Sequence, residues 1–537
     1  MLRHAAELAI RRPRTVVAVW IVVFVVGLGL GASVFGKLGG LGSNVPGSES
    51  KVTESRIVKL DPGADTIDAL VTSTTAGRVI GSDPTLKALV DEATADVRRI
   101  PGVAQVPDPY QPPGPGGDGQ VVPVRVTFAT GLSEDAENTA LDAAVARLRT
   151  IGTSEFAVRV AGGPLTDSAM SDTAQSDAAR AEMISLPIVL LLLVVVFGGV
   201  LAASLPLVLA FCGVASTLLV LYGFSFATNL SVYSVQITTM LGLGLGVDYA
   251  LLMVTRFKQE RAVTADIADC VRATVSAAGR TVFFSGLTVA VSLVGLVVYP
   301  APFLRSLGLA STAVVAVDMI AAVTLLPALL VKFGHRVKPA SAKQSEGRWF
   351  GRIAAGVVRY PLPVLLVIGA GLLAVAAPAS TMALSSGDAR GLPSDSEVRQ
   401  VYDLSLAHFP GHSNANPLYV LVENGAARRD YVAHLQSLPG VVDVPETKTY
   451  PDGSAVLQLT PAGTMDGKVA TDLVKTIRAE HQGAYVTGDT ARLVDFRQML
   501  SDRLPYAAGV VLVSVFVLLF LFTGSVLIPL KAVLTNL

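Results

Sequence analysis

The sequence of 537 residues predicts an α-helical polytopic membrane protein that carries two large α+β domains. Hydrophobic residues make up 51% of the chain and charged residues 16%, and the mean hydropathy is +0.56, which is typical of integral membrane proteins with sizeable polar parts. Neither a charged residue nor a histidine occurs between Met183 and Val247, a run that is much longer than one bilayer crossing of about 20 residues. The 42 Lys and Arg residues balance 42 Asp and Glu, so the overall charge gives no reason to expect a nucleic-acid partner.

Eight apolar segments are each long enough to cross a bilayer once. Basic residues concentrate before the first segment, between the fourth and fifth, and between the sixth and seventh, whereas the connections 227–234 and 299–303 carry no charge. Because basic flanks stay in the cytoplasm, the N-terminus and the basic connections are expected there. The expected spans are 16–34, 184–203, 205–226, 235–257, 282–298, 310–331, 363–384 and 505–527.

Two polar blocks, 39–182 and 385–503, lie between apolar segments and fall outside the cytoplasm by this alternation. In both blocks short β-type runs alternate with helical stretches as strand–helix–strand twice over, which is the pattern of a ferredoxin-like βαββαβ domain. The expected strands are 70–73, 103–106, 121–128 and 156–160 in the first block and 418–422, 441–444, 455–459 and 484–487 in the second. The expected helices are 85–99, 136–149, 426–438 and 465–481.

These boundaries divide the chain into consecutive regions. They are an N-terminal segment with the first span (1–38), the first α+β domain (39–182), a five-span bundle (183–334), a cytoplasmic linker (335–362), the seventh span (363–384), the second α+β domain (385–503), and the eighth span with the start of a ninth helix (504–537).

The two halves of the chain repeat one another. Arg12-Pro13 corresponds to Tyr360-Pro361, each directly before a span. Further matching pairs are 45–49 with 392–397, 101–107 with 439–445, and 160–162 with 486–488. Parallel repeats are a common transporter design. The first copy has six spans and the second only two, so we expect the chain to be truncated, with the counterpart of the 235–257 helix missing.

Asp248 is the strongest candidate functional residue, because it lies within the glycine-rich apolar segment 238–257. A charged side chain inside a membrane helix costs a few kcal/mol and is rare without a role. Burial in an apolar bundle can tune such a carboxyl to bind and release a proton. The hydroxyl of Tyr249 could bond a carboxyl on a facing helix. The alternative is an acid that is paired once for structural reasons.

Small residues on the same segment predict close helix packing. Gly242, Gly246 and Ala250 follow one another at intervals of four residues, which places them on one helix face. Gly244, one turn before Asp248, is assigned to the same packing role and leaves room beside the acid. Flexibility during a transport cycle is the alternative for these glycines, whereas a dinucleotide-binding loop is excluded, since it requires a soluble strand.

Three further residues could extend a proton path. Ser285 and Thr288 could continue a hydrogen-bond path to Asp248, or could bond a carbonyl one turn earlier in their own helix. Asp318 lies between the uncharged runs 306–317 and 319–331, and could join the path or pair with a group of the second copy. The histidines are scattered, so no metal site is expected. There is no phosphate-binding loop with a Walker lysine, which argues against ATP as the energy source.

Several motifs in chain order resemble the MMPL family, the mycobacterial membrane protein large branch of the resistance-nodulation-division (RND) transporters. This resemblance implies the RND-type duplicated architecture and a proton-driven exporter of lipids or other amphiphiles in an actinobacterial inner membrane. The family's two halves each contribute an Asp-Tyr pair to a proton relay, and only Asp248-Tyr249 occurs in this chain. The motifs are VPGSES (45–50), GLGLGVDY (242–249) with Arg256-Phe257, TVFFSGLTV (281–289), TLLPALL (324–330) and FTGSVLIPLKAVL (522–534).

On this reading the protein is a secondary transporter rather than an enzyme, and proton coupling requires no cofactor. Its expected partners are membrane lipids and a hydrophobic or lipid substrate, and both a monomer and a homo-trimer fit the sequence. Two other classes stay open, namely a truncated, non-transporting membrane scaffold or regulator, and a receptor similar to sterol-sensing proteins.

Overall fold

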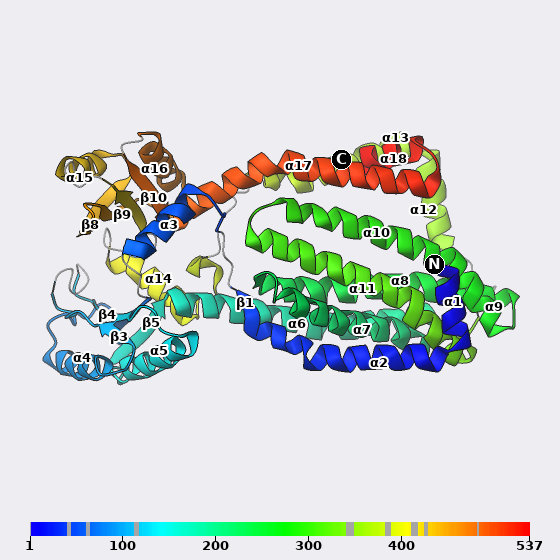
Figure 1. The fold of residues 1–537 in the computed structure, drawn as a ribbon, viewed down its shortest axis with the longest axis horizontal. Coiled ribbons are helices and arrows are strands. Elements are labelled where there is room, and N and C mark those ends of the chain that lie inside the picture. The colour runs from blue at the N-terminus through cyan, green and yellow to red at the C-terminus, as the bar shows by residue number, and fades with distance from the viewer. Residues whose placement is uncertain are drawn as a thin grey trace. The chain divides into compact units, whose positions relative to one another are not determined.

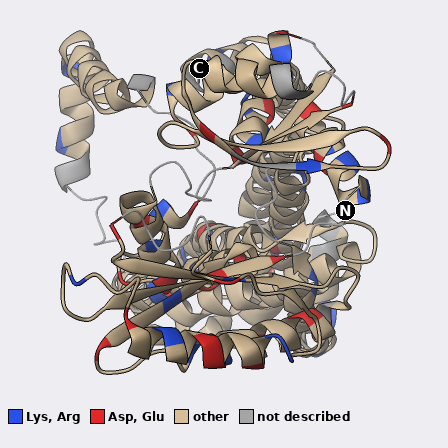
Figure 2. Cartoon of the chain, turned by 90° about the vertical axis from the view of Figure 1, so that its left-hand side faces the viewer, with Lys and Arg blue, Asp and Glu red and all other residues tan. Residues whose placement is uncertain are grey.

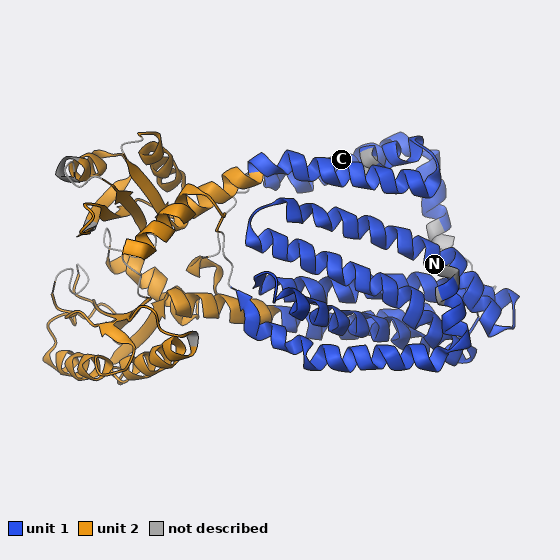
Figure 3. Cartoon of the chain, viewed as in Figure 1, with its two compact units in different colours: residues 1–39, 178–384, 501–537 blue, residues 40–177, 385–500 orange. Residues whose placement is uncertain are grey.

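The computed structural model describes residues 2–39, 44–60, 65–111, 118–339, 348–381, 388–409, 417–423, 428–480 and 483–536 (Figure 1). The chain forms two compact units (Figure 3). We call residues 1–39, 178–384 and 501–537 the helical unit, and residues 40–177 and 385–500 the α/β unit. Charged residues of both signs are interspersed on the helices and loops of the α/β unit (Figure 2), as expected of a solvated surface.

Eight helices among the described residues are long and apolar enough to cross a membrane. Figure 1 shows those of the helical unit running alongside one another. The helices that contribute to this unit are α1 (Leu2–Arg11), α2 (Pro13–Gly29), α6 (Gly163–Phe197), α7 (Val200–Phe224), α8 (Tyr233–Val263), α9 (Ile267–Thr274), α10 (Arg280–Val294), α11 (Pro302–Phe333), α12 (Arg348–Arg359), α13 (Pro361–Ala376), α17 (Asp489–Thr523) and α18 (Leu527–Asn536). One π-helical turn, Val275–Gly279, joins α9 to α10, and the two form a single span.

The boundary between the second and third spans differs from the sequence prediction. The predicted span 184–203 ran through a break in the chain, because α6 ends at Phe197 and α7 begins at Val200. Gly198 adopts a φ of +70°, a conformation that ends helices and is strained for other residues. The ammonium of Lys258 donates a hydrogen bond to the carbonyl of Phe197 at 3.1 Å, which satisfies one of the terminal carbonyls of α6. The chain stays uncharged on both sides of this break, so the lack of charge did not locate it, although the pair Gly198-Gly199 is typical of a turn.

Helix α11 forms the core of the helical unit. In the most apolar stretch of α11, 67% of the residues are buried, compared with 56% for α7 and none for α13. It packs against α7, α8 and α10. Helix α11 also contacts α2, where the indole Nε1 of Trp20 donates a hydrogen bond to Thr324 Oγ1 at 3.1 Å. A polar side chain carried by the middle of α11 therefore lies deep within protein.

The α/β unit contains two antiparallel four-stranded sheets with equivalent topology. Their orders are β3-β4-β2-β5 and β10-β7-β9-β8, so that in each the fourth strand in chain order lies beside the first, as in a split βαβ domain. The first domain comprises β2 (Thr66–Ser73), α4 (Pro84–Val97), β3 (Val103–Gln105), β4 (Val121–Phe128), α5 (Glu134–Arg149) and β5 (Phe156–Gly162). The second comprises β7 (Leu418–Val422), α15 (Arg428–Ser437), β8 (Val441–Thr449), β9 (Ala455–Pro461), α16 (Lys468–Ala479) and β10 (Ala484–Gly488).

All eight strands and four helices of these domains overlap the predicted ones, but β2 begins four residues earlier and β8 ends five residues later than predicted. The alternation of buried and exposed side chains along β4 explains why such runs can be recognised in the sequence. The predicted helix 426–438 begins, and the predicted helix 465–481 ends, at positions outside the described residues.

Each domain is completed by a helix from the other half of the chain. Helix α3 (Glu49–Leu60) packs on β10 of the second domain, and α14 (Glu397–His408) packs on β5 of the first. The guanidinium of Arg478 forms ion pairs with Glu49 at 3.2 Å and with Asp495 at 2.6 Å, and the backbone N–H of Ser50 donates to Asp495 at 3.0 Å. This exchange holds the two α/β domains together within their unit.

Candidate functional site

The two residues of the Asp-Tyr pair lie on different sides of α8. Tyr249 is only 6% exposed, and its hydroxyl is buried without a hydrogen-bond partner among the described residues. Asp248 is exposed. Consecutive residues of an α-helix point about 100° apart, so the burial of Tyr249 directs Asp248 toward the outside of the bundle. The acid that the sequence ranks first is therefore not enclosed by the described residues.

Asp318 is the carboxyl that the bundle encloses. It lies in the middle of α11 and has no exposed surface. Neither carboxyl oxygen has a hydrogen-bond partner among the described residues, and no basic side chain of that part of the chain pairs with it. An ionised carboxylate left unpaired in such surroundings costs several kcal/mol. The surroundings therefore suit a carboxyl that carries a proton.

Glycines of two other helices make room for this carboxyl. A Cβ atom on Gly213 of α7 would overlap with Asp318 Oδ1. A Cβ atom on Gly242 of α8 would lie 3.9 Å from Asp318 Oδ2, and only 2.8 Å from Val214 Cγ2. The three helices α7, α8 and α11 thus surround Asp318, and any side chain larger than hydrogen at position 213 would displace it.

Three of the four small residues singled out in α8 are buried at contacts with neighbouring helices. A Cβ atom on Gly246 would lie 2.8 Å from the Cα of Ala210, so α8 and α7 approach closely at this level. Ala250 is fully buried, like the backbone at Gly242. Gly244 differs from the other three, because it is exposed and a Cβ atom there would meet no described atom within 4 Å. It lies one turn from Asp248 on the same open face, since four residues are about one helical turn.

On α10, the residue shown next to Tyr249 is a glycine, Gly286. The hydroxyl of Thr288 donates to the carbonyl of Phe284 at 2.8 Å, which is the structural alternative left open by the sequence. Ser285 is exposed. The Cβ position of Gly286 lies 3.2 Å from the Tyr249 hydroxyl and 3.2 Å from the Met319 sulfur. Because Gly286 has no side chain, Tyr249 can approach α10. The space beside Gly286 holds both the Tyr249 hydroxyl and the side chain of Met319, the residue after Asp318.

Sequence reasoning missed Gly213 and Gly286. Both lie in apolar helices among other small residues, with Ala210 and Thr217 close to Gly213 and Ala290 one turn after Gly286. The contact between Gly213 and Asp318 joins helices that are far apart in the sequence, so only the packed bundle reveals it. The sequence did supply one signal, which is the position of Asp318 in the middle of an uncharged run.

Comparisons with known proteins agree with this architecture. A family model described as MMPL family matches residues 43–364 and 377–536. The chain is 48% identical over 544 residues to the membrane protein SCO6666 of Streptomyces coelicolor, with all of this chain and 76% of that protein covered. It is 30% identical over 480 residues to the heme uptake protein MmpL11 of Mycobacterium tuberculosis, with 83% of this chain and 50% of that protein covered.

A third relative is the mycolic acid-containing lipids exporter MmpL11 of Mycolicibacterium smegmatis. It is 28% identical over 570 residues, with 99% of this chain and 59% of that protein covered. The chain thus spans only about half the length of the MmpL11 proteins. The family match extends through both halves of the chain and includes the helices around Asp318 as well as both α/β domains. The protein is a multi-pass membrane protein of the MMPL family, a branch of the RND-superfamily transporters.

Proposed function

We propose that this chain belongs to an exporter that uses the proton-motive force to move lipids or other hydrophobic or amphiphilic molecules across the inner membrane. The relative named as an exporter of mycolic acid-containing lipids supports this class of substrate. The observation that carries proton coupling is the enclosed carboxyl of Asp318, which is unpaired among the described residues and lies beside the helix that bears the Asp-Tyr pair.

In this proposal two acids have different roles in the proton relay. Asp248, on the open face of α8, exchanges protons with its surroundings, whereas Asp318 holds a proton inside the bundle. Tyr249 follows Asp248 in the chain and points inward, so it provides a hydroxyl between the exposed and the enclosed regions. Ser285 and Thr288 have supporting roles at most, because Thr288 already bonds to its own helix. No cofactor takes part.

Proton binding can drive transport only if it favours one conformation over another. When Asp318 is protonated, the packing of α7, α8 and α11 described above is favourable. Loss of that proton would leave a charge in an apolar enclosure at a cost of about 3 kcal/mol, which is enough to change the ratio of two conformations more than a hundredfold. Deprotonation would thus favour an arrangement in which the carboxylate reaches water or a cation.

The two α/β domains, assigned here to 39–182 and 385–503, would act as the extracytoplasmic porter domains. The basic residues that flank the spans support this orientation. Substrate would enter laterally from the bilayer and pass along these domains. A homo-trimer and a monomer would both accommodate this function.

The test is transport by the intact protein in its membrane. We expect Asp248→Asn and Asp318→Asn each to abolish the pH-gradient-dependent movement of a fluorescent fatty acyl lipid in membrane vesicles, while Asp269→Asn, an exposed acid of α9, leaves it unchanged. Unchanged transport in both variants would remove the relay from the mechanism. If the unmodified protein moves no lipid under any gradient, the scaffold or receptor class is favoured instead.

A further inference from the structure

A cavity of about 510 Å³ in the α/β unit has no role in the proton relay. It opens where the loop after β2 meets α14, the helix that the second half of the chain contributes to the first domain. Its volume lies in the range of sites for small molecules. Its walls come from 72–78, 120–121, Arg159 of β5, and 400–408 of α14.

Arg159 is a cation in this wall that has neutral partners. Its guanidinium donates from Nε to the side-chain oxygen of Gln400 and from Nη1 to Thr72 Oγ1 at 3.1 Å. Among the described residues no carboxylate forms an ion pair with it. A guanidinium has five N–H donors, so three remain for another acceptor. This geometry suits a carboxylate or a phosphate, which a guanidinium can bind through two parallel hydrogen bonds.

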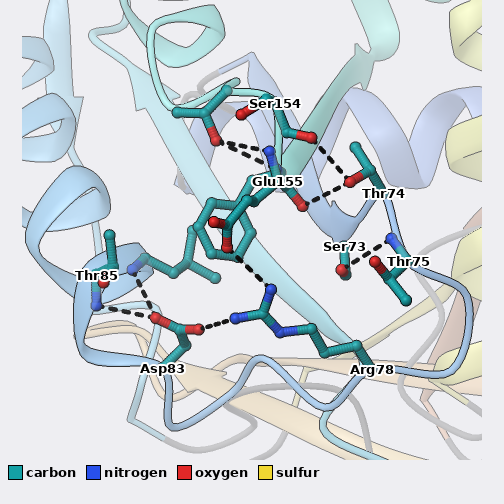
Figure 4. A network of polar contacts seen from close by, with 11 residues as sticks. Ser73, Thr74, Thr75, Arg78, Asp83, Thr85, Ser154 and Glu155 are labelled. Carbon is teal, nitrogen blue, oxygen red and sulfur yellow. Dashed lines mark hydrogen bonds and ion pairs between the residues drawn. The ribbon is translucent and has the colours of Figure 1, made fainter.

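The other charged groups of the wall already have partners of opposite charge. Arg78 donates to Asp83 at 2.8 Å and to Glu155 at 3.0 Å (Figure 4). His408 bonds to Asp118 at 2.7 Å. Asp403 is paired with Arg399 at 2.9 Å, which offsets the one carboxylate that lines the cavity. Arg159 is therefore the position where an added negative charge gains most.

The loop beside Arg159 is held in place without a ligand. Figure 4 shows the hydroxyl of Thr74 between the carbonyls of Ser154 and Glu155, to which it donates at 3.0 and 3.2 Å. The backbone N–H of Thr75 donates to Ser73 Oγ at 3.1 Å. Ser73 and Thr75 are both among the residues that line the cavity. A site that is formed in advance loses less entropy on binding.

An apolar wall adjoins the polar one. Leu404 of α14 is half-buried and packs on the apolar cluster that joins the first sheet to α14, whose members include the fully buried Val121 of β4. Ala407 continues this wall along α14. The cavity thus presents a cation at one side and an aliphatic surface at the other, which matches a molecule that carries both an anionic group and an acyl chain.

We propose that this cavity binds the anionic headgroup of an amphiphile, with Arg159 holding its carboxylate or phosphate and Leu404 and Ala407 contacting the first part of its chain. This inference rests on the proposed function and extends it, because it assigns a negative charge to the headgroup of the transported molecule. Its test, however, measures binding and does not depend on transport.

The experiment measures binding to the purified full chain in maltoside detergent by titration calorimetry, with dodecyl phosphate and dodecyltrimethylammonium as probes of equal chain length. We expect dodecyl phosphate to bind, the cationic probe not to bind, and Arg159→Gln to weaken dodecyl phosphate binding about tenfold or more. Arg99→Gln, which removes an exposed arginine from the same domain, is the matched control and should bind like the unmodified chain. Ala407→Trp should weaken binding by filling the apolar side without a change of charge.

Equal affinity for both probes, or equal affinity of the Arg159→Gln and Arg99→Gln variants, would overturn the proposal. Binding of inorganic phosphate as tight as that of dodecyl phosphate would overturn the amphiphile assignment and leave a site for free anions. Thermal unfolding of the Arg159→Gln variant checks its fold, and Arg159→Lys should retain part of the affinity. If dodecyl phosphate binds through Arg159 while proton-coupled transport fails, the site stands and the proposed function falls.

Discussion

The backbone N–H of Val160 donates a hydrogen bond to Glu397 Oε1 at 2.8 Å, and this contact links the two halves of the duplicated chain. The equivalent contact occurs in the other domain, where the N–H of Val486 donates to Glu49 Oε1 at 3.1 Å. Both valines lie on edge strands of their sheets. Each exchanged helix therefore satisfies a backbone donor that an edge strand would otherwise leave open.

The exchanged glutamates should contribute to the stability of the α/β unit. Glu49→Ala is expected to lower the free energy of unfolding by about 2 kcal/mol, since it removes a partner from the partly buried Arg478 and leaves the N–H of Val486 unsatisfied. Glu397→Ala should cost less, because its partner Arg149 is largely exposed. Urea unfolding followed by tyrosine fluorescence measures both.

The control is Glu423→Ala, which breaks the exposed pair between Glu423 and Arg56 of α3. Exposed ion pairs contribute roughly 0–1 kcal/mol, so this variant should unfold almost like the unmodified chain. A cost for Glu423→Ala equal to that for Glu49→Ala would contradict the role given to the buried contact.

Gly213 should be intolerant of substitution. Gly213→Ala places a methyl group on the carboxyl of Asp318, and the overpacking should cost about 1–3 kcal/mol. Gly244→Ala is the matched change in α8, where the added methyl meets open space among the described residues, and it should be neutral or stabilising by up to about 1 kcal/mol. Thermal unfolding in detergent compares the two. Equal effects would show that Asp318 is not enclosed as described.

Asp318→Asn should separate folding from function. The amide resembles the protonated carboxyl in shape and lacks charge, so thermal unfolding is expected to shift by less than the effect of Gly213→Ala, while proton-coupled transport is lost. Asp318→Lys should prevent stable folding, because it combines a larger side chain with an unpaired charge. A folded and active Asp318→Lys variant would be incompatible with an enclosed site.

Stability at low pH should depend on Asp466. Burial raises the pKa of this carboxyl, but hydrogen bonds from Arg390 and Thr464 outweigh that effect and lower the pKa from 3.8 to about 2. Since the folded pKa lies below the unfolded one, the stabilisation of about 2 kcal/mol is complete well above pH 4 and is lost as the pH falls toward 2. Urea unfolding between pH 6 and pH 2.5 should show a shallower loss for Asp466→Asn than for the unmodified chain. Parallel curves would contradict the assignment.

The repeat explains why so much of the fold could be predicted. Helix α2 begins at Pro13 and α13 at Pro361, and the residues before them, Arg12 and Tyr360, have nearly equal backbone angles of −134°, 56° and −129°, 59°. Proline at the first helical position fixes the start of a helix through local geometry alone. The strands of both sheets are local in the same sense, because short runs rich in apolar residues mark them, such as LYVLV of β7 and AVLQLTP of β9.

The break between α6 and α7 was predicted at 204 and lies at 198–199, because span length and hydropathy alone placed it. Gly198 ends α6 through its positive φ and Gly199 follows it, and such a Gly-Gly pair marks a turn that an analysis of hydropathy alone does not register. The packing role of Gly244 was likewise inferred from its position one turn before Asp248. In the structure, neighbouring helices cover the face of α8 that carries Gly242 and Gly246, and Gly244 lies on another face.

The sequence by itself determined that the protein crosses a membrane several times, that it carries two α/β domains from a duplication, and that Asp248 and Asp318 lie within membrane helices. These conclusions depend on composition, periodicity and the cost of charge in a bilayer, all of which are properties of single segments. The tertiary structure alone decided that Asp318 is the enclosed acid, that Gly213 makes room for it, and that Asp248 faces outward. Burial within a helix bundle depends on which faces of distant helices meet, and that is fixed only when the helices pack.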